Sequence, residues 1–160
     1  QHTLLMTIPG IDWYVAAVLI SEIGVDMKVF FSACHLAAWA GVCPGNNESG
    51  GKQKNGLARK GNVHLKTALV QAAIGSSKTK GTYLKDKYFR LKARRGGLRA
   101  AVAIAHKILI AAYHMLSSAK PYQDLGDTYL DKLNESRTAN NLVRRLERLG
   151  YNVQLERKAA

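Results

Sequence analysis

Residues 98–118 constrain the fold most strongly, because they are apolar almost all round a helix. That pattern is typical of a central helix buried on several sides. His106 and Lys107 interrupt the segment, so we find no charge-free run long enough to span a bilayer and expect no membrane partner. With 160 residues and 47% hydrophobic content, the chain can bury a core as one domain around this helix.

The rest of the pattern predicts a mainly α fold: a helix-hairpin-helix followed by a small helical bundle. Apolar residues recur at helical spacing, Asp12 and Ser32 are capping residues that precede two of the segments, and a further helix runs from Asn62. A glycine-rich basic loop interrupts the bundle, and short β elements fit near that loop and near Tyr151. We expect Leu36 and Trp39 in the core, and treat His106 and His114 as core histidines.

Residues 4–24 contain two apolar segments joined by the turn IPGID, which resembles a helix-hairpin-helix. The hairpin amides of this motif bind a backbone phosphate at a helix N-terminus, and the turn here consists of Pro9, Gly10 and Ile11. Asp12 stands where the second glycine of the motif is usual, and its carboxylate would repel phosphate. The turn is therefore either a phosphate site or a packing and assembly element.

Positive charge is concentrated in residues 52–99, which hold fourteen Lys or Arg against one acid, Asp86. The rest of the chain is neutral, so this segment accounts for the whole net charge of +13. Such a segment favours a polyanionic partner, DNA or RNA. An anionic membrane surface and a solvated basic face are the alternatives.

Residues 41–62, GVCPGNNESGGKQKNGLARKGN, combine a small nucleophile with glycines and cations. Ser49 precedes paired glycines, and Gly lets a backbone approach a ligand closely. The same residue types also make ordinary surface loops. The segment does not match a phosphate-binding P-loop, because Gln53 replaces the Ser or Thr and no hydrophobic strand precedes it. A β-hairpin is an option near residues 52–57.

Several cations are candidates for phosphate contact. Those in the loop surround Ser49, and the others lie on the two helices expected to follow it. The candidates are Lys52, Lys54, Arg59, Lys60, Lys66, Arg90, Arg94 and Arg95.

The character of the sequence changes after Pro121, and residues 121–160 are nearly charge-balanced. We divide the chain into residues 1–126 and a C-terminal helical appendage, 127–160, with a short strand from Tyr151 to Leu155. The appendage could dock on another domain or a second copy. Cys34 and Cys43 have no second pair, so neither a disulfide framework nor a zinc site is expected. Because the first residue is Gln1, we expect a piece of a longer protein.

Taken together, these segments resemble the C-terminal transposase domain of the insertion-sequence family named one-ten, which includes the pilin-gene DNA invertases. The resemblance rests on LLMTIPGI with VAAVLISEIG, HLAAWAGVCPGNNESGGK, RKGN, LVQAA, AYHML and PYQDLG. It covers most of residues 4–126, and the tail NLVRRLERLGYNV also fits.

The resemblance implies a prokaryotic DNA recombinase of the cytoplasm and nucleoid with a two-part active site. An N-terminal RuvC-like domain would bind Mg²⁺ through acidic residues, and the present domain would contribute the serine that falls on Ser49. Several members use a structured bridge RNA, and recombination of two duplexes implies a homo-oligomer in action. No metal ligand is expected here, because the early carboxylates form no recognisable cluster: Asp12, Glu22, Asp26 and Glu48.

Two other functions remain open. A non-catalytic helix-hairpin-helix module for DNA or RNA binding and assembly would use the Ser49 loop only to follow phosphates. A ribosomal-type RNA-binding protein would suit the charge but leaves the glycine-flanked serine unexplained.

We expect the isolated chain to bind nucleic acid and to leave DNA uncut. The basic segment supplies attraction to phosphates, whereas the acidic residues of the recombinase belong to another domain. Incubating the chain with labelled duplex DNA and magnesium checks both points. Cleavage by this chain alone would contradict the expectation.

Overall fold

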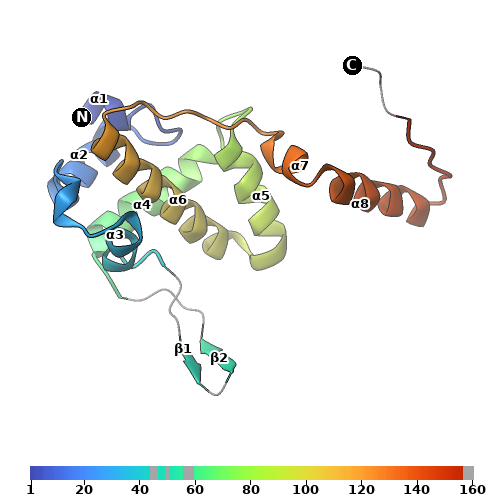
Figure 1. Ribbon diagram of the computed structural model, residues 1–160, viewed down its shortest axis with the longest axis horizontal. Coiled ribbons are helices and arrows are strands. Elements are labelled where there is room, and N and C mark those ends of the chain that lie inside the picture. Colours follow the sequence, from blue (N-terminus) through green and yellow to red (C-terminus); the bar gives the residue numbers. More distant parts are fainter. Residues whose placement is uncertain (44–46, 50, 56–59, 157–160) are drawn as a thin grey trace.

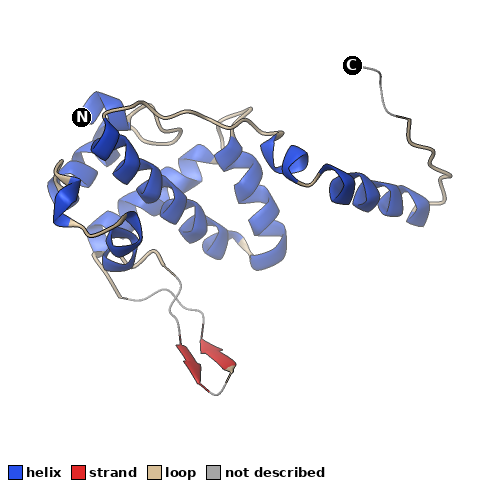
Figure 2. Ribbon diagram, in the orientation of Figure 1, coloured by secondary structure: helices blue, strands red, loops and turns tan. Residues whose placement is uncertain are grey.

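The computed structural model describes residues 1–43, 47–49, 51–55 and 60–156, and its secondary structure is mainly helical (Figures 1 and 2). This confirms the predicted fold class. The helices are α1 His2–Leu5, α2 Trp13–Ile23, α3 Ala33–Trp39, α4 Val63–Ser76, α5 Tyr83–Arg95, α6 Gly97–Ser118, α7 Tyr129–Leu133 and α8 Glu135–Arg148, with a 3-10 turn at Met27–Val29. Two short strands, β1 Asn47–Ser49 and β2 Lys52–Asn55, form an antiparallel pair.

The core is built around α6, which packs against α3, α4 and α5 (Figure 1). Ile104, Ile108 and Leu109 of α6 are completely buried, as are Leu65 and Leu69 of α4. By length and composition alone α6 could cross a membrane, yet half of its most apolar stretch is buried inside the protein. Its contacts on three sides are those expected of the central helix of a folded domain.

The two capping residues predicted from the sequence, Asp12 and Ser32, start their helices as expected, and Asn62 caps a third. Asp12 Oδ1 accepts a hydrogen bond from Val15 N at 2.8 Å, and Ser32 Oγ accepts one from His35 N at 3.2 Å. Asn62 Oδ1 accepts from Leu65 N at 3.0 Å. Each cap satisfies an amide that the helix itself cannot.

The turn between α1 and α2 is packed tightly on α4. Gly10 has φ +88°, and a Cβ at this position would lie 2.2 Å from Ala72 O and 2.5 Å from Ser76 N. Gly75 of α4 faces Gly10 in turn, so two backbones meet where neither carries a side chain. The close contact supports the packing interpretation of the turn, while phosphate binding by Pro9, Gly10 and Ile11 stays a prediction.

Trp39 and the C-terminal segment differ from what the sequence predicted. Trp39 is 46% exposed and packs on Phe30 at a ring separation of 5.8 Å, because it ends the short α3 at the surface. Leu36 is fully buried, as expected. Residues 151–156 form no strand, since no other described strand lies beside them to complete a ladder. The appendage helix α8 is present; its Leu142 and Leu146 are exposed, as is Leu149, which follows the last residue of the helix.

Gly10→Ala should destabilise the protein by at least about 3 kcal/mol, because it adds both a positive-φ penalty and a clash with the α4 backbone. Gly24→Ala is the matched control, since Gly24 has φ +69° but nothing within 4 Å of its added Cβ. It should cost less than Gly10→Ala, about 1–3 kcal/mol, because φ +69° and ψ −170° strain any residue with a side chain but no clash is added. Urea unfolding monitored by circular dichroism measures both. Equal losses of unfolding free energy in the two variants would contradict the tight packing of the turn on α4.

Candidate functional site

The backbone of Ser49 lies at the end of β1, beside the turn of a two-stranded hairpin (Figure 2). Ser49 pairs with Lys52 across the ladder, and Gly51 between them has φ +72°. Glycine adopts this conformation without strain, which explains its place in so tight a reversal. The register shifts between Asn47 and Glu48, where the pairing is irregular. The hairpin therefore begins earlier than the predicted 52–57 and turns directly after the serine.

The two ends of this excursion meet at a contact between glycine backbones. A Cβ on Gly61 would lie 2.4 Å from Gly41 N and 2.5 Å from Ala40 C. Gly41, with φ +71°, follows α3, and Gly61 precedes α4. The chain thus leaves and re-enters the helical body at one point, and in Figure 1 the hairpin extends away from that point.

Asn62 joins this base to the N-terminal helices. Its side-chain amide donates a hydrogen bond to Glu22 Oε2 of α2, while its oxygen caps α4. One side chain therefore fixes the start of α4 and its position against α2. Glu22, considered in the sequence only as a carboxylate, is engaged in this structural contact.

The predicted loop cations occupy different parts of this arrangement. Lys52 and Lys54 lie in β2, and Arg59 lies outside the described residues. Lys60 is exposed just before the base, and Lys66 is half-buried in the first turn of α4. The structure places Lys52, Lys54, Lys60 and Lys66 at the hairpin and its base, and their contact with a phosphate stays a prediction.

The other predicted cations lie on α5. Arg94 and Arg95 are exposed in its last turn. Arg90 is committed to two carboxylates: its Nε lies 2.8 Å from Asp86 Oδ2, and its Nη2 lies 2.8 Å from Asp131 Oδ2 of α7. Hydrogen bonds to Asp131, and then to Asp86, raise the pKa of Arg90. Arg90 therefore ties α7 to α5, a role that the sequence pattern did not indicate.

Among the described residues no cluster of three or more His, Cys, Asp or Glu could hold a metal ion. These residues do not fit a Mg²⁺ site. Cys43, near the base of the hairpin, is a poor competing nucleophile, because burial, and secondarily the neighbouring Cys34, raises the pKa of its thiol.

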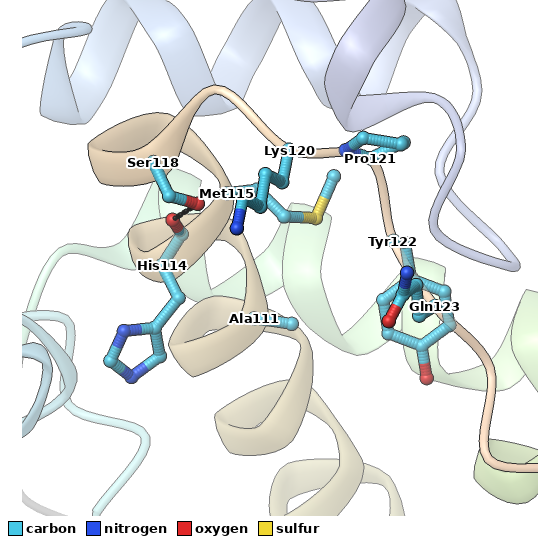
Figure 3. A pocket seen from close by; sticks show the side chains of 8 residues that line it. All are labelled: Ala111, His114, Met115, Ser118, Lys120, Pro121, Tyr122 and Gln123. Carbon is cyan, nitrogen blue, oxygen red and sulfur yellow. Dashed lines mark hydrogen bonds between the residues drawn. The ribbon is translucent and has the colours of Figure 1, made fainter.

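The sequence interpretation missed a pocket at the C-terminal end of α6. The pocket has a volume of about 300 Å³ and lies between α6 and residues 120–123 (Figure 3). His114, expected in the core, is exposed at its edge. Residues of the segments AYHML and PYQDLG line this pocket together. Both segments were singled out in the sequence, but the sequence does not show that they lie side by side.

The fold and this arrangement define a basic, mainly α domain that presents a glycine-turn hairpin. Residues 2–89 match the family model described as "Transposase IS116/IS110/IS902 family". The chain therefore belongs to this transposase family, as its resemblance to the family named one-ten predicted.

Individual relatives agree with the family match. The chain is 31% identical over 121 residues to the "Transposase for insertion sequence element IS1111A" of Coxiella burnetii, covering 73% of this chain and 33% of the relative. It is 30% identical over 127 residues to the "Pilin gene-inverting protein" of Moraxella bovis, covering 76% of this chain and 38% of the relative. A protein with the same description from Moraxella lacunata is also 30% identical. The chain spans only about a third of the length of these relatives, from 33% to 38%.

Asn62→Ala should lower the free energy of unfolding by about 1–2 kcal/mol, because it removes both the cap of α4 and the contact with Glu22. Asn62→Ser keeps a capping oxygen and loses only the link to α2, so it should lose about half as much. Urea unfolding compares the two variants. Equal stability of both variants and the unmodified protein would show that this side chain does not hold the base.

Proposed function

We propose that this chain is the serine-bearing part of a DNA recombinase that moves an insertion sequence, with Ser49 as the nucleophile. The observation that carries the proposal is the position of Ser49, at the end of a strand and directly before a glycine turn, in a chain of the transposase family. Ser49 lies next to the tip of this hairpin, whose base is fixed to the helices, and a DNA duplex could reach the serine there.

The chemistry is a phosphoryl transfer. Attack by Ser49 Oγ on a DNA phosphorus forms a phosphoserine and releases a deoxyribose hydroxyl. A deoxyribose hydroxyl then attacks the phosphorus of the phosphoserine, which rejoins the DNA and releases the serine hydroxyl. Because the energy of the phosphodiester bond is kept in the phosphoserine, no ATP is needed. Lys52, Arg59 and Lys60 are proposed to offset the charge on the phosphate in the transition state.

An unactivated serine needs a proton acceptor. Because the described residues do not fit a metal site, we assign the acceptor to a separate part of the full-length protein, the RuvC-like domain that the family resemblance implies. A bridge RNA and a homo-oligomer are further proposed partners.

Electrostatics support DNA as the partner. Residues 52–99 carry the whole net charge, and Lys60, Arg94 and Arg95 are exposed in the structure. Cations of this kind bind phosphates without sequence preference and release counterions, so affinity should fall steeply with salt. A binding module without catalysis would share this behaviour, and only chemistry at Ser49 separates the two.

Ser49→Ala in the full-length protein should abolish the covalent protein–DNA adduct while leaving DNA affinity within about twofold, because the hydroxyl is the attacking group and carries no charge. The adduct is detected on denaturing gels with labelled element-end DNA, magnesium and any flanking noncoding RNA. Ser32→Ala, which removes a capping hydroxyl far from the hairpin in sequence, is the matched control and should retain the adduct. An adduct that persists in Ser49→Ala would place the nucleophile elsewhere.

A further inference from the structure

The pocket between the end of α6 and residues 120–123 is held open by bonds on both sides. Tyr122 N donates to Thr7 Oγ1 at 3.0 Å, which ties this segment to the N-terminal turn. Asp124 Oδ1 accepts from Tyr83 N at 2.9 Å at the start of α5 and from Gly126 N at 2.7 Å. The segment is therefore fixed at two points before any ligand enters, and a preformed pocket binds at a lower entropic cost.

The lining combines apolar surface with polar groups that have no partner. Ala111, Met115 and Pro121 supply the apolar part (Figure 3). In the part of the chain that the structure describes, the side chains of Lys120 and Gln123 make no hydrogen bond or ion pair, and the imidazole of His114 only contacts the ring of Tyr113. Ser118 is different, because its hydroxyl donates to His114 O at 2.7 Å.

Tyr122 forms an aromatic wall. It is half-buried, and burial, followed by Asp124, raises the pKa of its hydroxyl, which keeps the phenol neutral. His114 and Gln123 lie on either side of Ala111 in Figure 3, with Lys120 reaching in above. Aromatic rings, a thioether, an amide with free donor and acceptor, and one cation are thus presented to the same space.

We propose that this pocket receives an unpaired nucleobase of a nucleic-acid strand, with the adjoining phosphate at Lys120. A nucleobase is flat and apolar on its faces and carries donors and acceptors on its edge, which match the rings and the Gln123 amide. The volume of about 300 Å³ is at the small end of ligand pockets and suits one base.

The inference rests on the proposed function only in requiring that the protein meets nucleic acid. Exchange of DNA strands exposes unpaired bases, and a pocket that holds one would favour the opened strand over the duplex. The pocket also gives a function to the segments AYHML and PYQDLG, which take no part in the proposed chemistry at Ser49.

Fluorescence anisotropy with the isolated chain tests the proposal, using short labelled single-stranded DNA, single-stranded RNA of the same sequence, and duplex DNA. Gln123→Ala removes the base-edge contact without changing charge, and Ala111→Leu fills the pocket. Each should weaken single-strand binding about five- to tenfold and change duplex binding by less than about twofold. Gln71→Ala, on exposed α4 surface, is the uncharged control and should change neither.

Lys120→Ala should weaken single-strand binding more than Lys107→Ala, which removes the same charge from an exposed position of α6 outside the pocket. Thermal melting confirms that each variant is folded, and Gln123→Ala at the surface provides the test if Ala111→Leu is not. The tighter of the two single strands identifies the source of the base.

Unchanged single-strand affinity in Gln123→Ala, or equal losses for single strand and duplex, would overturn the pocket assignment. Failure of the unmodified chain to bind any of the three probes would instead count against the proposed function. The two failures are therefore distinguishable.

Discussion

The backbone contact between Gly41 and Gly61 is the constraint on which the candidate site depends. An added Cβ at Gly61 would lie 2.4 Å from Gly41 N, so the two chain segments approach more closely than any side chain would permit. The contact closes the base of the hairpin and delivers the chain directly to Asn62, which caps α4 and bonds to Glu22 of α2. Hairpin position and helix packing are therefore set together.

A second close backbone contact, between Gly10 and Gly75, fixes the N-terminal turn against the other end of α4. Close backbone contacts therefore hold α4 at both ends, and packing on α6 holds it along its length. Such a helix gives a stiff platform, because a close-packed interior shifts little without loss of contacts. Residues 120–126 cross the same body and close the pocket at the end of α6.

Local features were predictable from the sequence, and long-range ones were not. Asp12 and Ser32 cap their helices as predicted, because a cap acts within a few residues of its own position, and a helix starts at Asn62 as the apolar spacing indicated. The exposure of Trp39 and His114 and the ion pair of Arg90 with Asp131 depend on which elements meet in space. Ser49 itself came from the family resemblance: the residues around it fit an ordinary loop equally well, and the structure adds the strand and turn that flank it.

The most direct test of the account compares adduct formation by Gly61→Ala and Gly10→Ala in the full-length protein, at a temperature where both remain folded. Both substitutions place a Cβ against backbone, but only Gly61 lies at the base of the hairpin. The account predicts that Gly61→Ala loses adduct at least about tenfold beyond Gly10→Ala, since misplacing a reacting group by about 1 Å can cost a hundredfold in rate. Equal adduct formation in the two variants would contradict it, because the hairpin base would then have no special role in the chemistry.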